Sequence, residues 1–195
     1  MTQLTIDDLL RQQQRQTTPS VSANISEKVH HFYESLQRGE NARLHAFWDE
    51  AYQRYFGTVH KVERFTERRQ QRSGRDTRVT LQGGEIIHVQ EKSRDRDDDR
   101  DIALEFEHKG QRYNAPGWVD LDLQIHYLAY AFVPLRKVYF FPWAQLRRAW
   151  IEHGEDWKSL CPVIGSLNDG YTTYCVCVPV TILFKAIVEA SVIQL

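Results

Sequence analysis

Two short runs, Asp76-Thr77-Arg78-Val79-Thr80-Leu81 and Glu85-Ile86-Ile87-His88-Val89-Gln90-Glu91-Lys92, flank Gly83-Gly84 and predict a β-hairpin. A three-residue loop, 82–84, pairs Val79 with Ile87 and gathers the apolar side chains on one face. A two-residue loop would place Val79 opposite His88 and mix the faces. Gly84 then suits the left-handed position of a bulged turn. On the opposite face, the open end of the hairpin gathers three polar side chains: Asp76, Gln90 and Lys92.

These three side chains suit the chemistry of phosphate esters. A carboxylate and a second oxygen ligand hold Mg²⁺ or Mn²⁺, which prefer oxygen donors. Such a metal lowers the pKa of its bound water and neutralises charge on a phosphate. A neighbouring lysine orients the water or stabilises the developing negative charge. We therefore expect Asp76 and Gln90 to be metal ligands and Lys92 to be catalytic.

At these residues the sequence resembles the PD-(D/E)XK nuclease superfamily. That family has an Asp on one strand and (D/E)-x-Lys on the next, followed by a helix and a strand. Here Asp76 is followed, after residues 77–89, by Gln90-Glu91-Lys92. The resemblance implies an α/β or α+β fold, a restriction-endonuclease-like core with a central mixed sheet flanked by helices. It also implies a divalent-metal-dependent deoxyribonuclease that uses Mg²⁺ or Mn²⁺.

The chain departs from that family in two ways. Gln90 stands where the family usually has an acid, so it brings a carbonyl oxygen but no charge. Alternatively, Glu91 is the ligand and the register differs by one residue. An additional strand, expected at 101–107, follows the signature, and Asp101 or Glu105 on it could contribute to the site.

Other candidate site residues come from neighbouring segments. In the family, a glutamate on the helix before the sheet often completes the site. Glu50 is the better candidate, and Glu34 is the second. His88 falls on the site face of the hairpin. Gln124 lies on the helix expected after the signature, where related nucleases sometimes place a polar site residue.

A basic stretch precedes and enters the hairpin. Between Lys61 and Arg78 there are seven Lys or Arg and three acids, a net charge of +4. The stretch is either a solvated surface or a surface for the DNA backbone. Its candidate DNA-binding residues are Lys61, Arg64, Arg68, Arg69, Arg72, Arg75 and Arg78.

Hydrophobic periodicity and turn residues predict the remaining elements. We expect helices at 25–37, 42–56, 118–132, from Pro142 onward and at 181–192. Further strands are expected at 58–65, 137–141 and 171–178, all in one mixed sheet. Residues 1–22, rich in Gln, predict a flexible N-terminal arm that could dock a protein partner. The remainder, 23–195, is expected to be a single domain.

Composition narrows the function classes. The 195 residues are 42% hydrophobic, yet no apolar run reaches the length of a membrane span, and no secretory signal is expected. The three cysteines have no zinc-ligand spacing, which favours a reducing compartment. The segments 101–105, 116–118 and 122–132 also resemble phage and prophage proteins of unassigned role, which implies the cytoplasm of a bacterial host cell. The alternative function is an inactive nuclease-fold module that binds nucleic acid or a protein.

Overall fold

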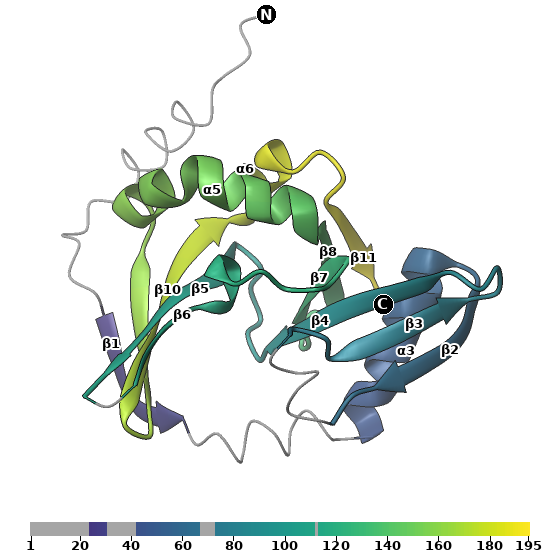
Figure 1. Cartoon of the computed structure of the whole chain (residues 1–195), viewed down its shortest axis with the longest axis horizontal. Coiled ribbons are helices and arrows are strands. Elements are labelled where there is room, and N and C mark those ends of the chain that lie inside the picture. Colours follow the sequence, from purple (N-terminus) through teal and green to yellow (C-terminus); the bar gives the residue numbers. More distant parts are fainter. Residues whose placement is uncertain (1–23, 31–41, 67–72, 112) are drawn as a thin grey trace, which may run out of the picture. The chain divides into compact units, whose positions relative to one another are not determined.

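The hairpin around Gly83-Gly84 forms (Figure 1), and its strands pair in the expected register. Its strands are β3, Thr77–Leu81, and β4, Ile86–Arg94. Val79 pairs with Ile87, and both side chains are buried. The amide before the three-residue turn donates to the carbonyl after it at 2.9 Å. Gly84 adopts a φ of +86°, the left-handed conformation that glycine tolerates best. The loop length and the sorting of side chains between faces are confirmed.

The structure is a computed structural model that describes residues 24–30, 42–66, 73–111 and 113–195. It divides into two compact units, each assembled from separate stretches of the chain. The first unit takes its described residues from Met1–His30, Arg100–Leu121 and Leu146–Val188. The second takes them from His31–Asp99, Asp122–Gln145 and Glu189–Leu195. The expected arm, 1–22, lies outside the described residues, and a single domain over 23–195 stays a prediction.

The second unit contains a mixed six-stranded sheet with the order β11-β8-β7-β4-β3-β2. Strand β4 runs parallel to β7, and the other neighbouring strands are antiparallel. The further strands are β2 Val59–Arg64, β7 Tyr127–Phe132, β8 Lys137–Pro142 and β11 Ser191–Gln194. Helix α3, Ala42–Phe56, buries Trp48 and Tyr52 in a core shared with Val79, Val89 and Phe140. One helix therefore covers the apolar face of the predicted hairpin.

The first unit contains a five-stranded sheet with the order β1-β9-β10-β5-β6. Its strands are β1 Asn24–His30, β9 Val163–Asn168, β10 Tyr171–Pro179, β5 Asp101–Gly110 and β6 Asn114–Pro116. Strand β1 joins β9 in parallel, and the other pairs are antiparallel. Helix α5, Trp143–Leu160, stacks Trp150 on Phe106 of β5. A short 3₁₀ turn, η1, spans Trp118–Asp120, and α6 spans Val180–Ala186.

The helix expected at 118–132 is wrong. Only η1 is helical there, and the second half is the strand β7. Five consecutive β7 side chains, Leu128 to Phe132, are buried, so the strand has no polar face. A continuous apolar run of this kind fits a central strand or a buried helix equally well by periodicity. The hairpin partner decides the outcome, because β7 pairs in parallel with β4.

Three smaller expectations also fail. Residues 24–30 form β1 rather than the start of a helix at 25–37, whose remainder lies outside the described residues. The helix expected at 181–192 ends at Ala186, and β11 begins at Ser191. Strand β5 pairs with β10 and β6, so it does not join the sheet of the hairpin. The described strands thus form two sheets instead of one. Within the described residues, no helix combines the length and the apolar character needed to cross a membrane.

Candidate active site

Asp76 lies directly before β3 and is tied to the neighbouring strand. Its Oδ2 accepts a hydrogen bond from the Glu91 amide at 2.9 Å, and its own amide donates to the Val89 carbonyl at 3.1 Å. The carboxylate therefore sits on the peptide that joins Gln90 to Glu91. Backbone contacts fix its position, so it does not depend on the rotamers of other side chains.

Gln90 is 7% exposed, and its Oε1 is buried without a hydrogen-bond partner. An unpaired buried carbonyl oxygen is costly, because it has lost its bonds to water. Successive side chains alternate between the faces of a strand, so Gln90 and Asp76 lie opposite Glu91 and Thr77. The oxygen without a partner thus belongs to the same face as the Asp76 carboxylate.

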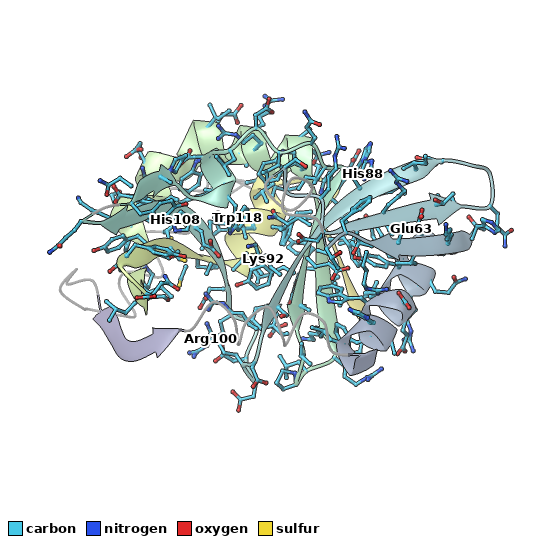
Figure 2. All side chains as sticks on the ribbon, turned by 60° about the horizontal axis from the view of Figure 1, so that its bottom comes forward. Glu63, His88, Lys92, Arg100, His108 and Trp118 are labelled. Carbon is cyan, nitrogen blue, oxygen red and sulfur yellow. The ribbon has the colours of Figure 1, made fainter. Side chains whose placement is uncertain are left out.

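Lys92 lies two residues after Gln90 on β4 and therefore on the same face of the strand. Figure 2 labels its side chain. Its side chain is partly buried, and in the ladder it pairs with Tyr130 of β7. Burial raises the pKa of Asp76 to about 7, although the charge of Lys92 and the bond from the Glu91 amide lower it. A carboxyl with that pKa exchanges its proton near neutral pH. A bound cation would favour the ionised form, since it adds positive charge beside the carboxylate.

Glu91 points to the other face of the sheet, towards α3. Its Oε1 accepts hydrogen bonds from the Tyr52 hydroxyl and from Thr77 Oγ1, each at 2.6 Å. Tyr52 and Thr77 are fully buried, and burial raises the pKa of Glu91. The confirmed register therefore gives Gln90, rather than Glu91, the position beside Asp76 and Lys92.

Glu50 does not join these residues. It lies on α3, but its carboxylate oxygens accept hydrogen bonds from Arg54 and Arg136, each at 2.8 Å. Both arginine partners are half exposed, so this is a surface ion-pair cluster. Glu34, the second candidate for the same role, lies outside the described residues. The α3 side chain that hydrogen-bonds to the hairpin here is Tyr52, through Glu91.

The described cations of the basic stretch have acidic or polar partners. Lys61 bonds to Glu63 at 2.9 Å, and Arg78 lies 3.8 Å from the same carboxylate. Arg64 lies 2.5 Å from Asp49, and Arg75 donates two hydrogen bonds to Gln124. Asp49 adds a negative charge that the sequence count of +4 does not include, whereas Glu63 is already part of that count and Gln124 is neutral. Arg68, Arg69 and Arg72 lie outside the described residues.

The secondary candidates fall in different places. His88 lies on the Gln90 face of β4, and its Nδ1 is buried without a hydrogen-bond partner. Burial lowers the pKa of His88, and the charges of Arg75 and Arg78 lower it further. Gln124 is exposed in the extended segment before β7, not on a helix. Asp101 and Glu105 lie on β5 of the first unit, in a sheet separate from the hairpin.

The donor set suits a hydrated hard cation. Within the described residues, no group of three or more His, Cys, Asp and Glu side chains is placed to hold a metal ion. One carboxylate, Asp76, and one amide oxygen, Gln90 Oε1, are the candidate oxygen donors on this face. Mg²⁺ commonly keeps several waters and takes one or two carboxylates, so this pair fits Mg²⁺ or Mn²⁺ and does not fit a closed zinc site. The buried oxygen without a partner is the observation that favours a ligand role.

Sequence reasoning missed the buried pair Tyr52 and Thr77. Tyr52 falls on the apolar side of the helix expected at 42–56, where its hydroxyl needs a hydrogen-bond partner once it is buried. The hairpin pattern likewise places the Glu91 carboxylate among the apolar positions of β4, where it too needs a hydrogen-bond partner. A carboxylate and a hydroxyl that both fall on core faces predict a buried bond between them.

No protein-family model, curated protein or solved structure matches this chain. The segment Pro116-Gly117-Trp118, which carries part of the resemblance to phage proteins, has a packing explanation of its own. A Cβ on Gly117 would lie 2.1 Å from the Glu105 carbonyl oxygen, so only glycine fits this approach to β5. Trp118 is buried beside it.

Proposed function

We propose that this protein is a divalent-metal-dependent nuclease that hydrolyses phosphodiester bonds of DNA. The observation that carries the proposal is the face of the hairpin formed by Asp76, Gln90 and Lys92. Asp76 is fixed by the Glu91 amide, Gln90 offers a buried oxygen without a partner, and the charge of Lys92 acts on Asp76. A carboxylate, a neutral oxygen ligand and an ammonium group are the parts that metal-assisted hydrolysis of a phosphodiester requires.

Each of these residues has a distinct role in the proposed reaction. The Asp76 carboxylate and Gln90 Oε1 would hold Mg²⁺ or Mn²⁺, which when bound supplies an acidified water and neutralises phosphate charge. The Lys92 ammonium donates hydrogen bonds to the attacked phosphate and stabilises the negative charge that develops on its oxygens. The backbone bond from the Glu91 amide holds Asp76 in place. Glu91 itself stays on the opposite face and supports β4 through Tyr52 and Thr77.

The order of elements supports a restriction-endonuclease-like core for the second unit. Helix α3 precedes the sheet, the aspartate precedes β3, the lysine lies on β4, and β7 later joins the same sheet. The family places a helix between the lysine strand and the next strand, whereas the described residues between β4 and β7 contain only the 3₁₀ turn η1 as helical structure. Instead, the chain leaves the unit after Asp99 and returns at Asp122. A phage-related protein of the bacterial cytoplasm stays a prediction.

A second candidate function is an inactive module of the same fold that binds nucleic acid or a protein partner. Two observations favour it. Gln90 contributes no charge, so a metal ion here would have a single anionic ligand among the described residues. Three of the four described cations of the basic stretch lie beside Glu63 or Asp49, which reduces their attraction for the DNA backbone.

Cleavage of labelled linear, nicked, branched and single-stranded DNA, with Mn²⁺ or Mg²⁺, tests the proposal. We expect cutting by the wild type that is lost in Lys92→Ala and in Asp76→Asn. Lys185→Ala, which removes an exposed lysine of the first unit, is the matched control and should cut normally. If Lys92→Ala cuts every DNA form as well as Lys185→Ala does, the catalytic assignment is refuted.

Titration of the wild type with Mn²⁺ by calorimetry separates the two candidate functions. A nuclease should show one saturable site that Asp76→Asn removes. An inactive module should show neither a specific site nor cleavage. A saturable site without cleavage of any DNA form would move the proposal to a metal-dependent binding module.

A further inference from the structure

A pocket lies in the first unit, where the β5–β6 and β9–β10 hairpins end next to each other. A pocket of about 560 Å³ opens there, and its walls include Lys109, Gln111, Asn168 and Tyr171. The register explains the proximity, because Tyr171 of β10 pairs with Gly110 at the end of β5. A pocket of this size suits a ligand of nucleotide dimensions.

Three aromatic rings form a cluster at this end of the sheet. The Tyr113 ring centroid lies 5.0 Å from that of Tyr171 and 6.0 Å from that of His108, which is labelled in Figure 2. Tyr171 and His108 also meet edge to face at 5.6 Å. His108 is held by a hydrogen bond between its Nδ1 and Thr173 Oγ1 at 2.9 Å. The rings are therefore arranged before any ligand arrives.

Tyr113 is 49% exposed although its ring is part of this cluster. Exposed aromatic rings held by a rigid neighbour offer a stacking surface at low entropic cost. The lining residues add polar groups rather than aliphatic ones, since Leu167 is the only aliphatic side chain among those described. Lys109 carries the only formal charge of these lining residues.

We propose that this pocket binds an unpaired base of a single-stranded nucleic acid. The base stacks on Tyr171 in the pocket wall and on Tyr113, whose ring adjoins that of Tyr171 at 5.0 Å. Its edge meets the Gln111 amide, and Lys109 faces the neighbouring phosphate. An apolar peptide would need more aliphatic lining than the described residues of this pocket supply. Stacking of bases on aromatic rings tolerates any sequence, because every base has a π-face. The site lies in the first unit and needs neither the metal nor Asp76.

Fluorescence anisotropy of a fluorescein-labelled oligothymidylate strand tests the proposal. The protein carries Asp76→Asn throughout, and the buffer contains EDTA, so neither cleavage nor the proposed metal site affects the reading. Tyr113→Leu removes the ring but keeps apolar volume, and Tyr113→Phe keeps the ring. Ile151→Ala, which truncates a side chain that is 70% exposed on α5 of the same unit, is the control.

We expect Tyr113→Leu to weaken binding about tenfold, the loss typical when a stacking ring is removed. Tyr113→Phe and Ile151→Ala should bind like the parent, and double-stranded DNA should compete poorly because its bases are paired. Equal affinity of Tyr113→Leu and the parent would overturn the proposal. So would the absence of binding by the parent, or equal loss in Tyr113→Phe, which would assign the contact to the hydroxyl. None of these outcomes depends on whether the metal site cleaves DNA.

Discussion

Replacing Asp76 by Asn should stabilise the protein, and increasingly so as the pH rises. The amide keeps an oxygen that can accept the hydrogen bond from the Glu91 amide. It removes the charge that burial opposes, since burial raises the pKa of Asp76 from 3.8 to about 7. The folded wild type therefore binds the proton more tightly than the unfolded chain does. Its stability, relative to the variant, is greatest below pH 3.8 and falls as the pH rises towards 7.

The size of this effect follows from the pKa shift. A shift from 3.8 to about 7 is about three units. At 1.36 kcal/mol per unit, this gives a ceiling of ~4 kcal/mol above pH 7. Part of this loss of wild-type stability has already occurred at pH 5. The same shift therefore predicts that the stability difference between the variant and the wild type grows by ~2.5 kcal/mol from pH 5 to pH 8. Because Asp76 is partly accessible to water, we expect this stability difference to increase by about 1 to 2.5 kcal/mol between the two pH values.

Urea unfolding of the wild type and Asp76→Asn at pH 5 and pH 8, in EDTA, measures the difference. Hydrogen exchange of the β3 and β4 amides reads the same effect locally, which matters because the chain has two compact units. Asp122→Asn, which removes an exposed carboxylate of the same unit, is the control and should show no such increase. A stability difference that is equal at both pH values would refute the reasoning. Mn²⁺ at pH 8 should stabilise the wild type and leave Asp76→Asn unchanged.

Two further variants test the packing around the site and in the first unit. Tyr52→Phe removes the hydroxyl that bonds to Glu91 and should cost ~1 to 3 kcal/mol in urea unfolding, whereas Tyr55→Phe, half-buried on the same helix, should cost less. Gly117→Ala brings a methyl group to about 2.1 Å from the Glu105 carbonyl and should cost more than ~2 kcal/mol by the same measurement. Gly83→Ala, which meets nothing within 4 Å, is its control, and equal unfolding curves for the two glycine variants would contradict the packing argument.

The hairpin could be predicted from the sequence because its information is local. Alternating side chains and the glycine pair determine the register without help from distant residues. That register also places Asp76 and Gln90 on the opposite face from Glu91. The same reasoning fails for 127–132, where every position but the first is buried. Whether such a run becomes a strand or a helix depends on β4, which lies far away in the sequence.

Only the part of the candidate site that lies on the hairpin strands could be predicted from the sequence. The sequence places Glu50 on the helix before the sheet, but it does not determine which face of that helix meets the hairpin. Its carboxylate meets Arg136, a residue of the turn after β7, whose position the sequence pattern does not give. The sequence does not predict two separate sheets either, because the pattern of β5 fits a strand in either sheet. Tertiary contacts decide in which sheet such a strand lies, and the local sequence pattern does not contain them.

Gln90→Glu tests whether the neutral oxygen limits this site. The variant restores the acid that the resembling nucleases carry and adds a second anionic ligand beside Asp76. Two buried carboxylates on one face repel each other, so in EDTA the variant should be less stable than the wild type at pH 8. A divalent cation relieves that repulsion, and we expect tighter Mn²⁺ binding by calorimetry and greater stabilisation by Mn²⁺ than in the wild type. Gln124→Glu, at an exposed position, controls for added charge. If Gln90→Glu binds Mn²⁺ no more tightly than Gln124→Glu does, then Gln90 does not face a metal, and the proposed ligand pair fails with it.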